Sequence, residues 1–126
     1  MMRLTEKKAA FIYAKAWNRL DCTEFLDLLD DTAHYASQWV FDELENKEAI
    51  ADYLINKIVA VKNSDAKVYA ELGITRSGFA GRYCVFITQG EKQAVVLFEV
   101  SKNKIQRFDL CIPELLNVKR TGVYPM

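Results

Sequence analysis

The sequence predicts one α+β domain, residues 1–126, in which a curved, cone-shaped antiparallel or mixed sheet of five or six strands carries three helices on its concave face. Helical periodicity dominates residues 5–61, whereas residues 66–112 alternate with the period of strands. The length of 126 residues suits a single domain. The 17 acidic and 17 basic residues balance, so neither nucleic acid nor an anionic membrane is expected as a partner.

Two long helices are predicted from capping residues and apolar stripes. Thr5 can cap the first helix, and Asn46 can cap another that ends at residues 63–65. The first stripe comprises Ala9, Ile12, Tyr13, Ala16, Trp17 and Leu20, and the second comprises Ile50, Leu54, Ile58 and Val61, with Tyr53 beside it. A stripe along one side of a helix predicts that this side packs against the sheet.

A short helix and a strand are predicted between these two helices. Asp21 and Glu24 have the spacing of a capping box, and Asp30-Asp31 predicts the end of the short helix, because carboxylates are unfavourable there. Residues 33–41 then alternate loosely as a strand, with Tyr35, Trp39 and Phe41 on one side and His34 and Gln38 on the other.

Four further strands are predicted at residues 67–76, 82–89, 93–101 and 104–112. Between the last two, Lys102-Asn103 has the form of a two-residue hairpin loop. Regular pairing across that loop places Phe98 opposite Arg107, and Val96 opposite Asp109. This register predicts that Arg107 and Asp109 face the helices, on an otherwise apolar face.

Both faces of the predicted sheet are rich in apolar side chains. The face away from the helices is expected to hold Val95, Leu97, Phe108, Leu110, Cys84 and Phe86. Helices can cover only one face, and an extensive apolar surface usually marks an interface. We therefore expect a homodimer formed through the outer face of the sheet.

The cysteine pattern bears on the cellular compartment and on metal binding. Cys22, Cys84 and Cys111 lack the paired spacing of a metal site, and an odd number favours reduced, buried, inert thiols in the cytoplasm. There is no apolar run of the roughly 20 residues that a membrane span needs, and the N-terminus lacks the apolar stretch of a signal peptide. Neither a metal nor a cofactor is expected.

Three stretches resemble the nuclear transport factor 2-like superfamily, which includes ketosteroid isomerases, SnoaL-like polyketide cyclases and limonene epoxide hydrolase-type enzymes. They are AWNRLDCTEFLDLLDDTAHYAS at 16–37, LENKEAIADYL at 44–54 and KNKIQRFDLC at 102–111. The resemblance implies the cone-shaped fold and a homodimer. The fold hosts enzymes, transport factors and dimerisation modules alike, so it does not assign an activity.

Aligned on the acidic pair, the family patterns differ in how well they fit this sequence. The general base of ketosteroid isomerases falls at Ala36 and their oxyanion-hole acid near Val96, which argues against that activity. Their helix-one tyrosine falls near Ile12, or at the adjacent Tyr13 if the alignment slips by one residue. Epoxide-hydrolase-type sites need two carboxylates and an arginine. Arg107 and Asp109 supply one of each, but the predicted register places Glu99, the nearest second carboxylate, on the opposite face.

Arg107, Asp109 and His34 are the candidate catalytic residues. Arg107 and Asp109 lie two apart on one strand, so both point the same way, and the arginine can lower the pKa of the aspartate. A partly buried ion pair at the rim of the cone is the alternative. His34 is the one histidine, the residue type best suited to carry a proton near neutral pH; the alternative is a rim residue without a catalytic role.

Aromatic side chains are the candidate ligand-binding residues. They are Tyr13, Trp17, Tyr35, Trp39, Tyr53 and Phe98. They can shape an apolar pocket with phenol hydroxyls as hydrogen-bond donors, or they can simply fill the core. We expect a small-molecule site for a mainly apolar ligand, with cofactor-free proton transfer as its possible chemistry. The alternative is a binding or dimerisation module without activity.

Overall fold

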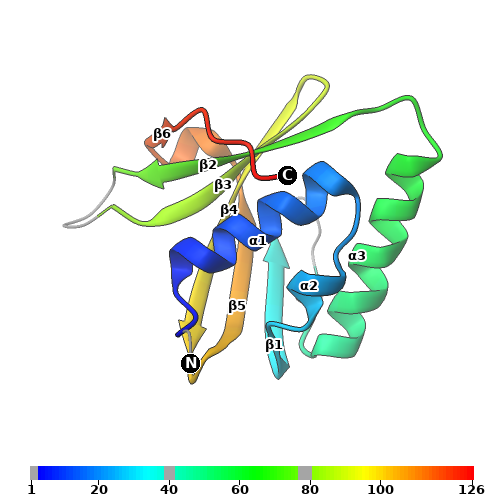
Figure 1. The fold of residues 1–126 in the computed structure, drawn as a ribbon, viewed down its shortest axis with the longest axis vertical. Coiled ribbons are helices and arrows are strands. Elements are labelled where there is room, and N and C mark those ends of the chain that lie inside the picture. The colour runs from blue at the N-terminus through cyan, green and yellow to red at the C-terminus, as the bar shows by residue number, and fades with distance from the viewer. Residues whose placement is uncertain (1–2, 39–41, 77–80) are drawn as a thin grey trace.

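Three α-helices and a six-stranded sheet make up the part of the chain that this computed structural model describes, residues 3–38, 42–76 and 81–126 (Figure 1). The helices are α1 (Glu6–Arg19), α2 (Thr23–Leu26) and α3 (Lys47–Lys62). The strands are β1 (Leu29–Ser37), β2 (Val68–Thr75), β3 (Tyr83–Gln89), β4 (Lys92–Ser101), β5 (Lys104–Cys111) and β6 (Val118–Arg120). The predicted α+β architecture is confirmed.

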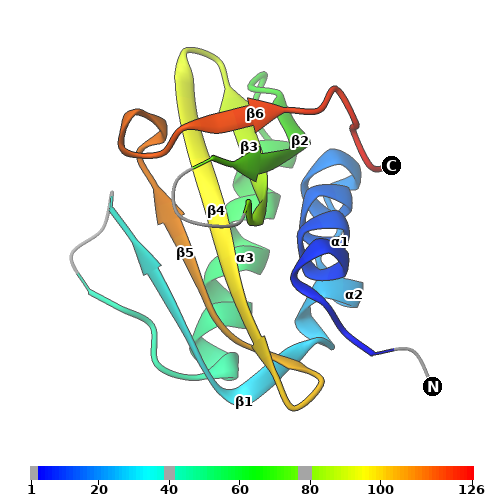
Figure 2. The same ribbon diagram turned by 90° about the vertical axis from the view of Figure 1, so that its left-hand side faces the viewer.

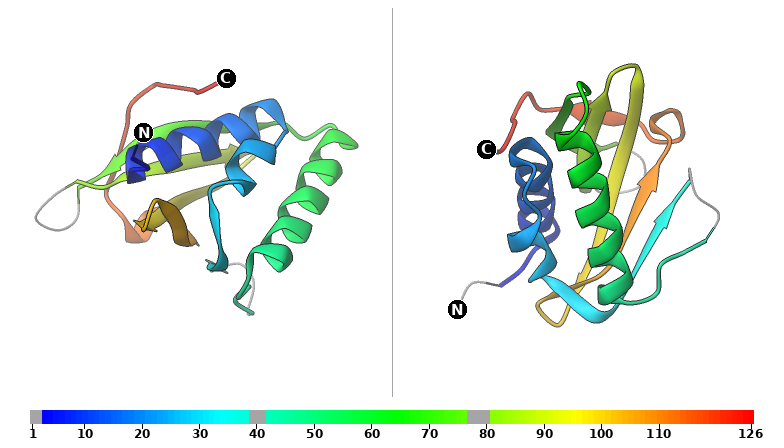
Figure 3. Two further views of the ribbon diagram at one scale, coloured as in Figure 1. Left: turned by 60° about the horizontal axis from the view of Figure 1, so that its bottom comes forward. Right: turned by 90° about the vertical axis from the view of Figure 1, so that its right-hand side faces the viewer.

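The sheet is mixed and has the strand order β1-β5-β4-β3-β2-β6 (Figure 2). β1 runs parallel to β5, and the other neighbouring strands are antiparallel. α1 packs across β2, β3 and β4, whereas α3 packs against β1 (Figure 3). Both long helices therefore contact the same face of the sheet, at different ends of it.

Both long helices begin and pack as the sequence predicts. The Thr5 hydroxyl accepts a hydrogen bond from the Lys8 amide, and the Asn46 side chain accepts one from the Ala49 amide. These bonds satisfy amide groups that lack partners within the helix. The predicted stripe of α3 is buried in full, and α1 buries Ala9, Ile12, Tyr13 and Ala16.

The short helix and first strand differ from the prediction in their bounds. β1 begins at Leu29, so Asp30 and Asp31 belong to the strand and do not end α2. Asp21 does not form a capping box with Glu24, because its carboxylate instead accepts hydrogen bonds from the amide and hydroxyl of Thr23. Trp39 and Phe41, predicted at the end of this strand, lie outside the described residues.

The register of the β4–β5 hairpin changes at Gln106. Both loop residues, Lys102 and Asn103, have positive φ values of 55° and 63°, and Val100 pairs with Ile105 as predicted. Beyond that pair, Glu99 lies opposite Arg107, so Gln106 is an extra residue that forms a β-bulge. One extra residue moves every later side chain of β5 to the other face of the sheet.

The prediction that Arg107 and Asp109 face the helices is therefore wrong. Phe108 and Leu110 take the inward positions, opposite Phe98 and Val96, and Phe108 is fully buried. Arg107 and Asp109 lie on the outer face, as does Cys111 opposite Val95. The physical reason is that the inward positions enter an aromatic core, where an aromatic ring gains burial and a charge would lose hydration.

This core is built around Tyr13 of α1. Its ring lies 4.8 Å from that of Phe25 and 5.4 Å from that of Phe98, centroid to centroid, both in edge-to-face arrangements. Tyr35 stacks on Phe108 at 4.4 Å. Such pairs stabilise a core beyond the area that they bury.

The outer face is partly covered by the chain's own C-terminal segment. Cys84, Phe86 and Val95 form a buried cluster there, and Leu116 and Val118 pack against it. The chain thus supplies part of the cover that we expected from a second subunit.

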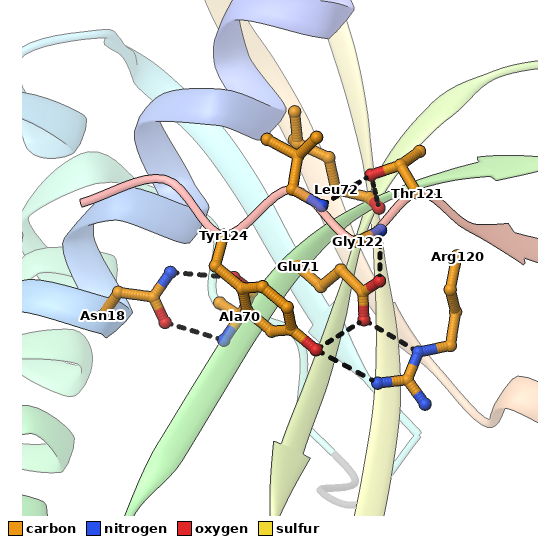
Figure 4. Close-up of polar contacts among 9 residues, drawn as sticks. Asn18, Ala70, Glu71, Leu72, Arg120, Thr121, Gly122 and Tyr124 are labelled. Atoms are coloured by element: carbon orange, nitrogen blue, oxygen red, sulfur yellow. Dashed lines mark hydrogen bonds and ion pairs between the residues drawn. The ribbon is translucent and has the colours of Figure 1, made fainter.

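The C-terminal segment is held on β2 by a buried carboxylate. β6 pairs with β2, which the sequence did not predict as a strand pair. The Glu71 side chain is 4% exposed and accepts hydrogen bonds from Arg120 Nε at 2.8 Å, Tyr124 Oη at 3.1 Å and the Gly122 amide at 2.6 Å (Figure 4). All three donors come from the tail, so one side chain fixes its path.

Asn18 of α1 holds the last residues of the tail. Its amide nitrogen donates to the carbonyls of Ala70 and Pro125, at 2.8 and 2.7 Å, and its amide oxygen accepts from the Ala70 amide at 2.8 Å. One side chain thereby joins helix, strand and tail.

Candidate functional site

A cavity of about 60 Å³ lies between α1, α3 and the inner face of the sheet. Its walls are mainly aromatic and aliphatic. They are formed by Tyr13, Trp17, Tyr35, Ser37, Tyr53, Leu54, Lys57, Val68, Ile87, Gln89, Lys92, Ala94 and Leu110. Ligand pockets for drug-sized molecules are several times larger, so the size fits a small molecule or part of a larger one.

Polar groups in the cavity wall interact with one another. The Tyr35 hydroxyl interacts with the side chains of Ser37 and Tyr53, and the Tyr13 hydroxyl interacts with that of Trp17. Burial raises the pKa of both Tyr13 and Tyr35 above that of an ordinary phenol. These phenols therefore stay protonated near neutral pH and can bind a polar atom of a ligand, but they are not bases.

Four of the six predicted ligand-binding residues line this cavity. Tyr13, Trp17, Tyr35 and Tyr53 do so, from three different elements. Phe98 does not, because its ring is buried behind Tyr13 in the aromatic core. Trp39 lies outside the described residues.

The three predicted catalytic residues lie together, but on the outer face of the sheet. His34 is opposite Arg107 across the β1–β5 pair, so the two side chains share that face. Arg107 Nε lies 3.0 and 3.1 Å from the two carboxylate oxygens of Asp109. None of these three residues belongs to the described wall of the cavity.

Glu43 completes this outer cluster of His34, Glu43, Arg107 and Asp109. Its carboxylate lies 2.6 Å from His34 Nδ1 and 2.6 Å from Arg107 Nη2. The hydrogen bond from His34, followed by that from Arg107, holds the pKa of Glu43 below its ordinary value. The side chains are between 28 and 39% exposed, so the cluster is open to solvent.

Sequence reasoning missed Glu43, Lys57 and Lys92. Glu43 lies in a loop, where no periodicity indicates which way a side chain points. The two lysines did carry a signal: Lys57 follows Tyr53 by one helical turn, and Lys92 precedes the inward residue Ala94 by two positions. Both relations place the lysine on the cavity side.

The cysteines are free thiols in unreactive surroundings. Burial raises the pKa of Cys22, Cys84 and Cys111, that of Cys84 to about 12. A raised pKa suppresses the reactive thiolate. Within the described residues, no group of three or more His, Cys, Asp or Glu side chains could hold a metal ion. None of the described helices has the length and apolarity to cross a bilayer.

No family model and no curated protein matches this sequence. Solved structures match over most of its length. A SnoaL-like protein of unknown function from Burkholderia thailandensis superposes with a TM-score of 0.63 at 14% identity, covering 96% of this chain and 100% of its own. The epoxide hydrolase/cyclase-like enzyme SalBIII, which has a role in pyran ring formation in salinomycin, gives 0.61 at 14% identity, covering 92% and 95%.

A nuclear transport factor 2-like protein of unknown function from Cytophaga hutchinsonii gives a TM-score of 0.56 at 13% identity, covering 90% of this chain and 96% of its own. At such identities the similarity shows the fold alone. The cone-shaped, cystatin-like arrangement expected from the sequence is thereby confirmed.

Proposed function

Because the chain has the nuclear transport factor 2-like fold, we propose that it is a small-molecule-binding protein whose ligand enters the cavity between α1, α3 and the sheet. The observation that carries this proposal is the cavity itself: an aromatic wall with a few converging hydroxyls, at the place where helices and sheet diverge. A mainly apolar ligand with at least one polar atom suits such a wall.

Binding is better supported than catalysis at this cavity. The acid and base groups expected from the sequence are on the other side of the sheet, and burial keeps Tyr13 and Tyr35 protonated. Proton abstraction needs a group whose pKa is near the working pH. The cavity wall instead offers hydrogen-bond donors and acceptors, which position a ligand.

The outer cluster supports a second candidate function, cofactor-free proton transfer or hydrolysis. Asp109, assisted by Arg107 and His34, would be its acid–base group, and Glu43 would be the second carboxylate. The specific observation in its favour is that two carboxylates contact one arginine, and a histidine lies 2.6 Å from one of them. Partial exposure would give a substrate access.

One experiment separates the two sites: native purification followed by mass spectrometry of any released small molecule. Ala94 is buried in the cavity wall, so Ala94→Leu should fill the cavity and abolish capture, whereas Asp109→Asn should leave it intact. Circular dichroism checks that both variants are folded. Loss of capture in Asp109→Asn alone would favour the outer cluster, and an empty wild-type protein would contradict the cavity proposal.

Homodimerisation through the outer face of the sheet stays a prediction. Leu97 and Cys111, on the outer face, are only partly buried, which supports a contact there. Leu116 and Val118 already cover the apolar cluster next to it, so a dimer would be formed by a smaller surface than the sequence suggested.

A further inference from the structure

We infer that the ligand of the proposed cavity is an anion, a short-chain monocarboxylate whose carboxylate lies between Lys57 and Lys92 at the cavity mouth. This inference rests on the proposed function, because it names the ligand class of the same cavity. Three observations carry it: the position of the two lysines, the absence of a carboxylate paired with either of them among the described residues, and the size of the space behind them.

The two lysines mark where the cavity meets the surface. Lys57, Gln89 and Lys92 line the cavity, and the same three residues line a broad, shallow groove of about 830 Å³ beside it. Residues shared by an inner and an outer space form the boundary between them. Lys57 comes from α3 and Lys92 from the start of β4, so the mouth has a cation on two different elements.

Neither lysine is neutralised within the described part of the chain. No salt bridge or side-chain hydrogen bond forms there at Lys57 or Lys92. The Lys57 ammonium lies 5.6 Å from the centroid of the Tyr53 ring, a cavity residue. Asp65 and Glu91 line only the groove, so among the described residues the cavity wall has two cations and no carboxylate.

The space behind the lysines is apolar and short. At about 60 Å³ the cavity holds on the order of four groups the size of a water molecule, which corresponds to a chain of about four carbons. Ala94, Ile87 and Leu110 provide an aliphatic floor on the sheet. An apolar chain would therefore be buried while its charged end stays at the mouth, between two cations.

Protein-observed NMR titration with butyrate, butyramide and butylamine tests the inference, because the three probes share a chain and differ in charge. Butyrate should bind about tenfold more tightly than butyramide, and butylamine should not bind. Raising the salt concentration from 20 mM to 500 mM should weaken the binding of butyrate more than that of butyramide, since exposed charges are screened.

Variants then locate the carboxylate. Lys57→Met and Lys92→Met keep the aliphatic stem, and each should weaken butyrate about three- to fivefold. Lys67→Met is the matched control, because Lys67 lines the groove and not the cavity. The affinity of this variant for butyrate should be unchanged.

The outcomes distinguish this inference from the proposed function. Butyrate and butyramide could bind equally well, with no effect of either cavity lysine variant. That result would contradict the inference that the ligand is an anion, but the cavity would remain a binding site. The inference would also be contradicted, and the cavity would remain a binding site, if butyrate did not bind while Ala94→Leu still abolished capture of a native ligand. If no probe binds and no native ligand is captured, both the anion inference and the proposed function are contradicted.

Discussion

Two arginine–carboxylate groups lie on the outer face of the sheet and differ in burial. Glu71, bonded to Arg120, is 4% exposed, whereas Asp109 and Glu43, bonded to Arg107, are 28% and 32% exposed. The buried carboxylate receives all its hydrogen bonds from one chain segment and fixes it in place. The less buried group joins Arg107 and Asp109 of β5 to Glu43 of the loop that follows β1, and it remains accessible. Burial, and not the type of ion pair, decides which group acts as a structural anchor.

The largest effect is expected for Glu71→Gln. All three partners of Glu71 donate hydrogen bonds, so a glutamine amide would set a donor against a donor and leave Arg120 without its charge partner. The Glu71 carboxylate is buried but the Arg120 side chain is 47% exposed, so the cost comes mainly from mismatched buried hydrogen bonds. We expect the free energy of unfolding to fall by roughly 2 kcal/mol in urea denaturation.

Glu99→Gln is the matched control for this variant. This substitution makes the same chemical change on the same face of the sheet, but Glu99 is exposed. Its effect on the free energy of unfolding should therefore be small. Equal losses in the two variants would show that burial does not separate them.

A smaller effect is expected on acidification. Burial alone would raise the pKa of Glu71, but the bonds from Arg120, Gly122 and Tyr124 outweigh it and hold the pKa below the ordinary value near 4.5. The unfolded chain then takes up this proton at higher pH than the folded protein. The stability contributed by Glu71 is thus complete above that ordinary value and is lost as the pH falls through the lower folded value.

Denaturation at pH 7 and pH 3 measures this contribution. Glu71→Gln should lose less stability between the two conditions than the wild-type protein, because it lacks the titrating group. A loss of the same size in both proteins would contradict the assignment, since Asp21, Asp30 and Glu43 also have lowered pKa values and are shared by both.

The smallest effect is expected for Arg107→Met. Its guanidinium is one-third exposed, and exposed ion pairs contribute about 1 kcal/mol or less. Unfolding in low and high salt should show a small loss that screening reduces further. A loss as large as that of Glu71→Gln would mean that the outer cluster is as structural as the tail anchor.

The helices and most strands could be predicted because their signals are local. Thr5 and Asn46 cap their helices, and Lys102-Asn103 forms the predicted loop. The prediction failed at Gln106 because it assumed unbroken pairing across the hairpin. Two adjacent polar residues, Gln106 and Arg107, interrupt the alternation between Ile105 and Phe108 and are a local sign of a bulge. Packing fixes the position of the bulge, because it buries Phe108 beside Tyr13.

The site was predicted in part for the same reason. The aromatic residues of the cavity lie on amphipathic elements, so periodicity indicated the side that they face. Glu43 and Glu71 acquire their partners from segments distant in sequence, Arg107 and Arg120. Contacts of that range depend on the assembled fold, and local patterns do not contain them.

The placement of the tail has a consequence for the edges of the sheet. Edge strands with unpaired backbone groups can pair with strands of other molecules and so promote aggregation. At one edge, the three-residue strand β6 carries Lys119 and Arg120, and both residues are unfavourable for further strand addition. At the other, Leu44 exchanges two backbone hydrogen bonds with Tyr35 of β1, each 2.9 Å long. Each of the two edge strands thus carries one feature that disfavours pairing with another molecule.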